Sequence, residues 1–536
     1  MNGLRKRSAS GDRGVFGALL ACALILAASA LAAQQPTPPP SAPDAKPAPA
    51  DAQQPGAGAQ LRTGTASGLD ADARLQNLLA DHQFLRIQAQ LDQLQPDQAQ
   101  YYRGILANRS NDLKASIDLL EPLIDRVTAA GDATQEKLLR KALAEDYLRL
   151  GDWVKAAKAY QALDTRLQGK LSADERDEIE MPLKMLPLAA ANPSMTVDPC
   201  DPFQLQVSKN PLGLTDIPVF VDASPHTWML DPTAPFNLIS RSVAKNVGLK
   251  VSDETVTIHT LTGRPMQVYV TVIPRFTVGG RLTLRNMTAF VFEDGDYFYP
   301  KSHYQVEGVL GYPALSALGS LTITSHATIE VRPAKQISPA EKDDQLTNGA
   351  RFFLDGDQVI VALGNAKIAN EPPPQPELKP EPAGEVALPK EPKPAGFAEP
   401  APAPDPKLTA TADASTPQET KPGEERMYAV DAAGQQSYLT SRYYDEHSAD
   451  FANQKMELFS IPGSLALPPQ PAYIAENVAL AVGAATVRVH YVQVLTQPIG
   501  SAALDDVYGV LGVDVLDQLK AYTFDYRTMR FGVRPE

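Results

Sequence analysis

The sequence is poor in the residues that hold metal ions or disulfide bonds. Among 536 residues only two are cysteines, Cys22 and Cys200, and the seven histidines show no metal-ligand spacing. We therefore expect no metal site. If Cys22 leaves with the N-terminal segment, no internal disulfide is possible. The sequence also lacks a Gly-x-Ser-x-Gly elbow and a phosphate-binding glycine loop, which excludes two common catalytic designs.

Basic residues are outnumbered by acidic residues, and long apolar runs are scarce. The formal net charge is −14, which argues against nucleic acid as a partner and gives no attraction to an anionic membrane surface. Beyond residue 33, no stretch is long and apolar enough to span a bilayer. We expect membrane association only if the N-terminal segment is retained.

That N-terminal segment has the features of a secretory signal. Basic residues near the start precede an apolar run over residues 15–33 that ends in small residues. This order predicts a signal peptide over residues 1–33 and export to the periplasm or the extracellular space. A short membrane anchor is an alternative, and a lipid anchor at Cys22 is a weaker one.

Two regions of different composition follow. Residues 34–66 are rich in proline, alanine and glutamine, which predicts a disordered linker. From 69 to 190 apolar residues recur at helical spacing. Residues 144–160 resemble a tetratricopeptide repeat, which implies paired helices that bind a peptide or protein partner, or that shield the rest of the chain. A plain helical bundle is the alternative. The separate helices are expected at 98–108, 112–126, 134–150 and 153–166.

Two aspartates lie in matching surroundings later in the chain. Around Asp231 and Asp431, each segment has apolar residues, the aspartate, small residues, and an apolar pair closed by a hydroxyl. A Gly-Val-Leu-Gly segment starts 77 residues after Asp231, at 308, and 78 residues after Asp431, at 509. Two ordered elements repeated at one spacing predict two copies of one structural unit, which can bring two carboxylates together.

This pattern resembles the retropepsin-like aspartic proteases, over residues 203–334 and 350–536. In that family each half supplies a strand that ends in Asp-Thr-Gly, and a later apolar-apolar-Gly segment packs behind it. The resemblance implies a multidomain α + β protein. A helical-repeat domain would precede two mainly antiparallel β lobes that form a pseudo-dimer. Two β-sandwich repeats with aspartates matched by chance are the alternative.

The chain departs from the family at the triplet itself. Asp-Thr-Gly is replaced by Asp-Pro-Thr at 231–233 and by Asp-Ala-Ala at 431–433. The family threonines bond through their hydroxyls to the opposite loop, and both second residues have lost that hydroxyl. The family glycines let the backbone approach the carboxylates, whereas Thr233 and Ala433 add a Cβ that restricts the backbone. The sequence therefore supports the fold better than the activity.

Each copy has a candidate hairpin between its aspartate and its glycine segment. In the family such hairpins are flaps that close over a bound peptide. The resemblance therefore implies that the hairpin tips bind substrate, and an ordinary surface turn is the alternative. The tip residues are Thr262, Gly263, Pro462 and Gly463.

The first hairpin of the second copy is interrupted. Strand residues 359–363 lead to an expected turn at Gly364 and Asn365, and the strand pattern resumes only at 427. Between them, the Pro/Glu/Lys/Ala tract 370–425 is too polar and proline-rich to pack. We interpret this tract as a disordered insertion inside one hairpin. A linker between domains is the competing interpretation.

The resemblance implies that Asp231 and Asp431 are the catalytic pair of an exported aspartic endopeptidase. Two carboxylates about 3 Å apart cannot both ionise, so such a pair shares one proton. Peptide hydrolysis by this pair requires no metal and no organic cofactor. The alternative is a pseudoprotease that binds a peptide or protein without cutting it. Each aspartate could also simply cap a tight turn.

Overall fold

The computed structural model describes residues 66–534 apart from several internal segments. The undescribed internal segments are 261–264, 325–326, 334–348, 357, 366–409, 414–424, 433 and 462–466. The predicted signal and nearly all of the predicted linker therefore lie outside the described residues. From Gly64 onward the chain forms one compact unit. Among the described residues, no helix combines the length and the apolar character that crossing a bilayer requires.

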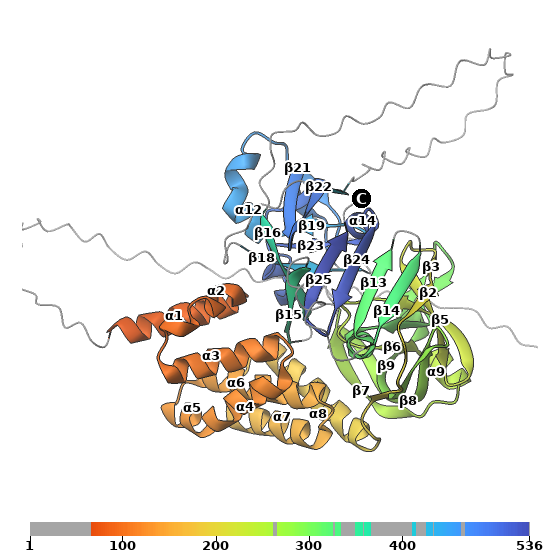
Figure 1. Cartoon of the computed structure of the whole chain (residues 1–536), viewed down its shortest axis with the longest axis horizontal. Helices are drawn as coiled ribbons and strands as arrows, with labels where there is room; N and C mark the ends of the chain where they lie inside the picture. Colours follow the sequence, from red (N-terminus) through yellow and green to blue (C-terminus); the bar gives the residue numbers. More distant parts are fainter. Residues whose placement is uncertain are drawn as a thin grey trace, which may run out of the picture. The chain divides into compact units, whose positions relative to one another are not determined.

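Helices fill the chain from residue 66 to 190 (Figure 1). They are α1 (Ala66–Ala80), α2 (Phe84–Gln88), α3 (Pro96–Arg109), α4 (Leu113–Leu120), α5 (Ile124–Ala130), α6 (Ala133–Arg149), α7 (Trp153–Leu167) and α8 (Ala173–Ala190), with 3-10 turns at Leu91–Gln93 and Glu121–Leu123. The four expected segments correspond to α3, to α4 with α5, to α6 and to α7. The helix α8 extends the region beyond the last expected segment.

Side-chain caps fix where several of these helices begin. Asp112, Asp132 and Ser172 each accept a hydrogen bond from a backbone N–H in the first turn of the helix that follows. A small residue allows α3 to pack closely on α4, because a Cβ at Gly104 would lie 2.4 Å from a side-chain carbon of Leu120.

Lobe 1 is a mainly antiparallel β structure between residues 196 and 318. Its strands are β1 (Thr196–Val197), β3 (Ser208–Lys209), β4 (Thr215–Val221), β5 (Ser224–Leu230), β6 (Leu238–Ser240), β7 (Val251–His259), β8 (Pro265–Val278), β9 (Leu282–Phe292), β10 (Phe298–Tyr299), β11 (Tyr304–Gln305) and β12 (Gly308–Leu310). Its helices are α9 (Arg241–Asn246), a 3-10 turn (Asp294–Tyr297) and α10 (Tyr312–Leu318). A tight turn joins β4 to β5, with Asp222 in the left-handed region at φ 57°.

Strands from both ends of the β region form one continuous ladder. Its order is β2 (Phe203–Gln206), β14 (Thr328–Arg332), β13 (Ser320–Thr324), β24 (Ala521–Asp525), β25 (Arg530–Arg534) and β15 (Gly349–Asp355). At the join between the halves, Thr322 lies opposite Thr523, and their hydroxyl oxygens are 2.9 Å apart. Six strands, three from each half, therefore tie the two lobes together through backbone hydrogen bonds.

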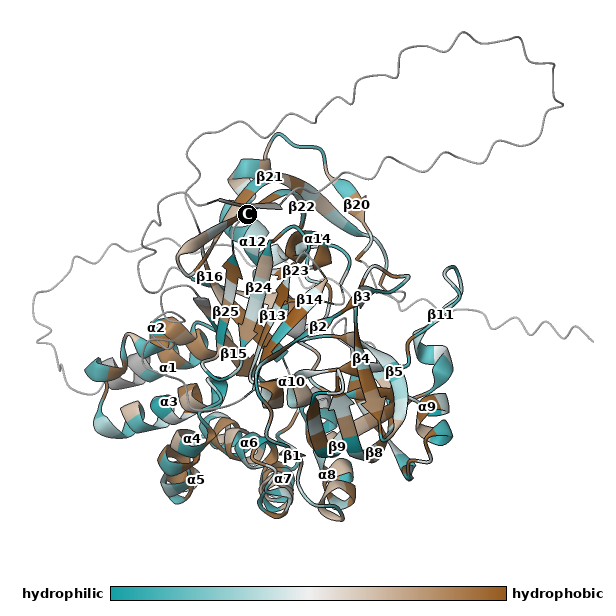
Figure 2. Ribbon diagram, turned by 45° about the vertical axis from the view of Figure 1, so that its right-hand side comes forward, coloured by the Kyte–Doolittle hydropathy of each residue, from teal (hydrophilic) through white to brown (hydrophobic). Residues whose placement is uncertain are grey.

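Lobe 2 continues from this ladder. Its strands are β16 (Gln358–Asn365), β17 (Ala410–Asp413), β18 (Arg426–Val430), β19 (Tyr438–Leu439), β20 (Glu457–Phe459), β21 (Gln470–Val482), β22 (Ala485–Leu495) and β23 (Gly509–Leu511). Its helices are α12 (Ser441–His447), a 3-10 turn (Ser448–Phe451), α13 (Ala502–Asp505) and α14 (Val513–Leu516). Buried apolar side chains, among them Trp228, Phe276 and Phe524, form a core that runs through both lobes. In Figure 2 many strands of the two lobes are accordingly coloured as hydrophobic.

Two expectations about lobe 2 are wrong. Gly364 and Asn365 do not form a turn but end β16, because β21 offers them a backbone partner. Within the tract expected to be disordered, residues 410–413 form β17, which pairs with β22. The sequence from 407 to 416 holds no proline, so every backbone N–H there is free to join a ladder. Within the rest of the tract, residues 370–409 and 414–424 lie outside the described residues.

The strands on either side of that tract pair with each other. Ile360 of β16 lies opposite Ala429 of β18 in an antiparallel ladder. In lobe 1 the adjacent strands β4 and β5 pair in the same antiparallel way. The chain therefore leaves one hairpin before the tract and re-enters the same hairpin after it.

The helical region is fastened to lobe 2 through a charged group at the end of β15. Asp355 lies 2.8 Å from Arg109 and 2.5 Å from His82. Arg109 is only 4% exposed and also lies 3.3 Å from Glu145. Burial raises the pKa of Asp355, but the positive charge of Arg109 and the hydrogen bond from His82 outweigh burial and hold that pKa well below its usual range. Asp355 is therefore a charged contact between the helices and the sheet.

Removing this charge is expected to destabilise the protein. Asp355→Asn should lower the free energy of unfolding at neutral pH by about 3 kcal/mol, because Arg109 stays buried with one partner fewer. The pKa of Asp355 is depressed, so its contribution is present above the unfolded carboxyl pKa near about 4 and is lost on acidification. Chemical denaturation at several pH values would measure both effects.

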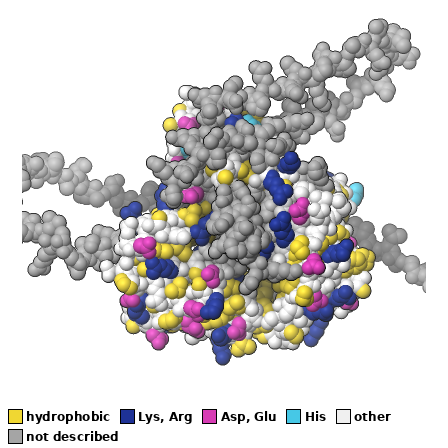
Figure 3. Space-filling model, in the orientation of Figure 1, with side chains coloured by type: hydrophobic (Ala, Val, Ile, Leu, Met, Phe, Trp, Pro, Cys, Tyr) yellow, Lys and Arg dark blue, Asp and Glu magenta, His cyan; other side chains and the backbone are white. Residues whose placement is uncertain are grey.

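An exposed ion pair provides the control for this measurement. Asp118 and Lys114 form an exposed pair within α4, and Asp118→Asn should cost less than about 0.5 kcal/mol. Equal losses from the two substitutions would contradict a structural role for Asp355. On the face shown in Figure 3, Lys and Arg side chains are interspersed with Asp and Glu side chains. An exposed ion pair is therefore a suitable comparison for the buried contact of Asp355.

Candidate active site

Asp231 follows β5 where three strands of lobe 1 meet. β12 runs parallel to β5, with Leu310 opposite Leu230, and it also pairs with β6 in the antiparallel direction. The backbone N–H of Asp231 donates to the carbonyl of Leu310 at 3.1 Å. The ladder therefore continues through the aspartate before the chain turns.

Asp431 occupies the same position in lobe 2. β23 runs parallel to β18, with Leu511 opposite Val430, and it pairs with β19 in the antiparallel direction. The backbone N–H of Asp431 donates to the carbonyl of Leu511 at 2.9 Å. The repeat of aspartate and Gly-Val-Leu-Gly segments in the sequence is therefore also a repeat of backbone hydrogen bonds.

The loop of lobe 1 closes in a tight turn against its glycine segment. The N–H of Ala234 donates to the carbonyl of Asp231 at 3.2 Å, and the carbonyl of Ala234 accepts from the N–H of Tyr312 at 2.7 Å. A Cβ at Gly311 would lie 2.1 Å from the carbonyl oxygen of Phe236. Only glycine lets the two segments approach this closely.

In lobe 2 the equivalent turn is made by Gly434. Its N–H donates to the carbonyl of Asp431 at 3.1 Å, and its carbonyl accepts from the N–H of Val513 at 2.8 Å. A Cβ on Gly434 would lie 2.4 Å from Oδ2 of Asp431. The backbone therefore approaches the Asp431 carboxylate closely at Gly434. Ala433 itself lies outside the described residues.

A buried polar side chain behind each loop was not anticipated from the sequence. The N–H of Gly311 donates to Oδ1 of Asn237 at 3.1 Å, and the N–H of Gly512 donates to Oγ of Ser437 at 2.8 Å. Both side chains are fully buried, and the Ser437 hydroxyl also donates to Asp514 at 2.7 Å. Each residue follows its aspartate by six positions, and this shared spacing is the signal that could have identified them.

The carboxylate of Asp231 is held by its own loop. Its Oδ1 accepts hydrogen bonds from the N–H of Thr233 at 3.1 Å, the hydroxyl of Thr233 at 2.9 Å and the N–H of Ala234 at 3.1 Å. Burial raises the pKa of Asp231, and these three donors oppose that effect. The expected restriction by the Cβ of Thr233 is wrong, because the backbone there does not adopt a positive φ. Its hydroxyl instead adds a donor.

Residues near both aspartates contact the opposite lobe. The side-chain amide of Gln435 donates to the carbonyl of Leu212 in lobe 1 at 3.1 Å. Lys209 of lobe 1 lies 2.8 Å from Asp517 of lobe 2. Tyr522 on β24 of lobe 2 is near Asp231 of lobe 1. The pKa of Tyr522 is raised mainly by burial, then by the charge of Asp517, and also by the charge of Asp231. The two aspartate loops therefore lie at the junction of the lobes.

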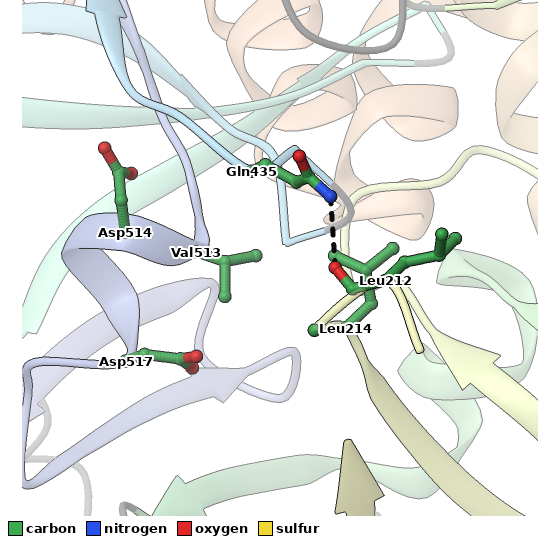
Figure 4. Close-up of a pocket in the computed structure, with 7 residues that line it drawn as sticks. Leu212, Leu214, Gln435, Val513, Asp514 and Asp517 are labelled. Atoms are coloured by element: carbon green, nitrogen blue, oxygen red, sulfur yellow. Dashed lines mark hydrogen bonds between the residues drawn. The ribbon is translucent and has the colours of Figure 1, made fainter. Parts of the chain in front are cut away.

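A cavity of about 280 Å³ opens at this junction (Figure 4). The Gln435 amide spans from lobe 2 to Leu212 at one side, and Asp517 lies on the other (Figure 4). The full lining is Leu212, Gly213, Leu214, Gln435, Val513, Asp514 and Asp517. Neither catalytic candidate lines this cavity, although Gln435 follows Asp431 by four residues. The volume suits a side chain of a bound peptide rather than a large ligand.

The two candidate flaps are hairpins whose tips are outside the described residues. In lobe 1, β7 and β8 pair up to His259 and Pro265, and the tip with Thr262 and Gly263 is not described. In lobe 2, β20 and β21 pair, and the tip with Pro462 and Gly463 is not described. The helix α8 contacts both β7 and β8 (Figure 1).

The described residues contain no cluster of His, Cys, Asp or Glu that would hold a metal ion.

Comparison with known proteins locates a family relationship in lobe 1. The model of the aspartyl protease family matches residues 217–314, which include β4, Asp231 and the first glycine segment. No curated protein matches the chain.

Two solved structures are similar to parts of the chain. One is a retropepsin-like aspartic protease from Rickettsia conorii, with 16% identity, 26% of this chain and 97% of that chain covered, and a TM-score of 0.19. The other is conglutin gamma, a basic 7S globulin from lupine seeds, with 10% identity, coverage of 63% and 96%, and a TM-score of 0.34. The match over residues 217–314 shows that lobe 1 is similar to the aspartyl protease family, in agreement with the resemblance seen in the sequence.

Proposed function

We propose that this protein is an exported aspartic endopeptidase that hydrolyses peptide bonds with the Asp231/Asp431 pair. One observation carries the proposal: each aspartate donates its backbone N–H to the leucine carbonyl just before the second glycine of its Gly-Val-Leu-Gly segment. An aspartate with a purely structural role would not require a second aspartate with the same hydrogen bonds, whereas an acid–base pair would. In this proposal the two copies, joined by one ladder, form a pseudo-dimer in which the two carboxylates face a shared cleft.

The chemistry follows from the sharing of one proton between two carboxylates. The ionised aspartate takes a proton from water while the water oxygen bonds to the scissile carbonyl carbon, and the protonated aspartate donates to the carbonyl oxygen. The aspartate that took the water proton then gives it to the leaving nitrogen as the C–N bond breaks, and the other aspartate takes back a proton from the hydroxyl on the former carbonyl carbon. Burial raises the pKa of Asp231, which favours retention of the shared proton in mildly acidic solution. No metal or organic cofactor takes part.

The substrate is a peptide or an unfolded protein segment in this proposal. The hairpin tips at Thr262, Gly263, Pro462 and Gly463 would cover the bound chain. The cavity beside Gln435 would take one of its side chains, and two aspartates in its lining favour a polar or basic one. The helical region, as a tetratricopeptide-like scaffold, would shield the lobes and bind a protein partner. Its contacts with β7 and β8 support the shielding role.

The cellular location in this proposal is the periplasm or the extracellular space. Its support is the order of basic, apolar and small residues within the first 33 positions. Retention of residues 15–33 would instead leave the protein attached to a membrane.

A pseudoprotease that binds peptides is the second candidate function. The observation in its favour is the missing hydroxyl at Pro232 and Ala432, which the family uses to join its two loops. The cleft would then grip a peptide without cutting it. Both aspartates would serve as hydrogen-bond acceptors for the backbone N–H groups of the ligand.

Cleavage of an unfolded protein by the full-length chain tests the proposal. We expect slow cleavage that is fastest in mildly acidic solution and falls as the pH rises through the raised pKa of Asp231, because the shared proton is then lost. Peptide products would be identified by mass spectrometry. A metal chelator should leave the rate unchanged. Binding of the same unfolded protein without any cleavage across the acidic range would favour the pseudoprotease.

A further inference from the structure

Tyr526 reaches from lobe 2 to the aspartate loop of lobe 1. It directly follows β24, and its hydroxyl donates to the carbonyl oxygen of Pro232 at 3.0 Å in a buried hydrogen bond. Its backbone N–H donates to the carbonyl of Gly319, also in lobe 1, at 2.9 Å. Tyr526 is therefore bound to lobe 1 through both its main chain and its side chain.

Three aromatic rings fix the ring of Tyr526. Its centroid lies 5.6 Å from the ring of Tyr312, 5.6 Å from Phe352 and 6.2 Å from Phe524. The side chain is only 5% exposed. A ring packed on several sides has one orientation, so the direction of its hydroxyl is set by the core.

The acceptor of this hydrogen bond belongs to the peptide unit that also supports the catalytic candidate. The carbonyl of Pro232 and the N–H of Thr233 are the two ends of one planar peptide group. That N–H donates to Oδ1 of Asp231 at 3.1 Å, while the carbonyl accepts from Tyr526. One peptide group is thus held from both sides. A hydrogen bond on the carbonyl also polarises the N–H and strengthens its bond to the carboxylate.

We propose that Tyr526 is a positioning residue for Asp231, because it holds from the opposite lobe the peptide group that donates to the carboxylate. The inference rests on the proposed aspartic protease function. Pro232 has lost the hydroxyl with which the family joins its loops, and the Tyr526 hydroxyl supplies a bond between the lobes at the same residue. Tyr526 touches neither the substrate nor the reacting atoms, so it acts only through the loop.

The test is Tyr526→Phe in the full-length chain, which removes one hydroxyl and keeps the ring contacts. We expect kcat to fall about tenfold or more with KM within about twofold, since the loop holds the catalytic group rather than the substrate. Amide exchange at Thr233 and Ala234, followed by NMR, should speed up about fivefold or more while β24 and β25 stay protected.

The control removes a similar hydroxyl far from the loop. Tyr147 in α6 is 6% exposed, and its hydroxyl donates to Glu121 at 2.8 Å. Tyr147→Phe should lower the Tm by a comparable amount and leave kcat and the two amides unchanged. Unchanged kcat and unchanged exchange in Tyr526→Phe would overturn the positioning role. If the wild type cuts nothing but the two amides of Tyr526→Phe exchange faster, the proposed function fails and the positioning of the loop stands.

Discussion

Replacing Asp231 with asparagine is expected to abolish cleavage. The amide keeps the size of the side chain and can still accept hydrogen bonds from Thr233 and Ala234, but it cannot share a proton or act as a base. General acid–base catalysis contributes about 10²–10⁴-fold, so the rate should fall at least about a thousandfold. Asp431→Asn should have the same effect. The double substitution should add little, because the two carboxylates act as one unit.

A surface carboxylate provides the control for these substitutions. Asp198 forms an exposed ion pair with Arg285 at 2.8 Å, and Asp198→Asn removes the same charge away from both loops. Its rate and pH profile should match those of the wild type. Cleavage rates of the five proteins (the wild type, the two single substitutions, the double substitution and the control) on one unfolded substrate, with products identified by mass spectrometry, would provide the comparison. Wild-type cleavage that survives Asp231→Asn would exclude the aspartate mechanism.

The pH dependence of the cleavage rate, measured on the same proteins, is a second test of the shared proton. Burial raises the pKa of Asp231, so its proton is held to higher pH than in an ordinary carboxyl group. Activity that depends on a shared proton should therefore extend above the usual carboxyl range and fall on the alkaline side. This limb should be absent from any residual cleavage by Asp231→Asn.

The lobes were predictable because their signals are local and repeated. An aspartate at the end of an apolar strand and a glycine segment at fixed spacing recur twice, and each glycine is required by a backbone approach that excludes Cβ. Asn237 and Ser437 carry the same kind of signal, at one offset from each aspartate, but different residue types obscured it. Features that recur in both copies are therefore the ones that can be predicted from the sequence.

Features that depend on contacts between distant segments were not predictable. The bond from Tyr526 to Pro232 joins residues 294 positions apart, and no periodicity marks it. The close approach of Gly434 to the Asp431 carboxylate depends on how the loop folds and was not expected either. A strand such as β17 depends on the partner that β22 offers, since local composition alone does not favour it.

Restoring the lost hydroxyls is expected to produce the largest gain in activity. In Pro232→Thr combined with Ala432→Thr, each hydroxyl would reach toward the opposite loop and rebuild the interlock that the family uses. Misplacement by about 1 Å can cost roughly a hundredfold, so better positioning of the loops should raise kcat by up to about that factor. The Tyr526 hydrogen bond would persist, because its acceptor is the backbone carbonyl of residue 232.

Changing the third residue of the lobe 1 loop should have the opposite effect. Thr233→Gly with Ala433→Gly would complete the family triplet in both lobes. In lobe 1, however, the change removes a hydroxyl that donates to Oδ1 of Asp231 at 2.9 Å. We expect the fourfold variant, with both threonines and both glycines, to exceed the wild type but to cut more slowly than the two-threonine variant. Steady-state rates on one peptide would rank the three proteins.

A pair of valines separates the hydroxyl from the shape of threonine. Pro232→Val with Ala432→Val has the same branched outline without the donor, and Ala432 is only 7% exposed, so any crowding would be shared by both variants. The valine variant should remain at the wild-type rate or below it. If the valine variant gained as much activity as the threonine variant, Pro232 itself, rather than the missing interlock, would be what limits the activity of the native loop. A folded threonine variant that binds unfolded protein and never cuts it would establish that the cleft is a binding site.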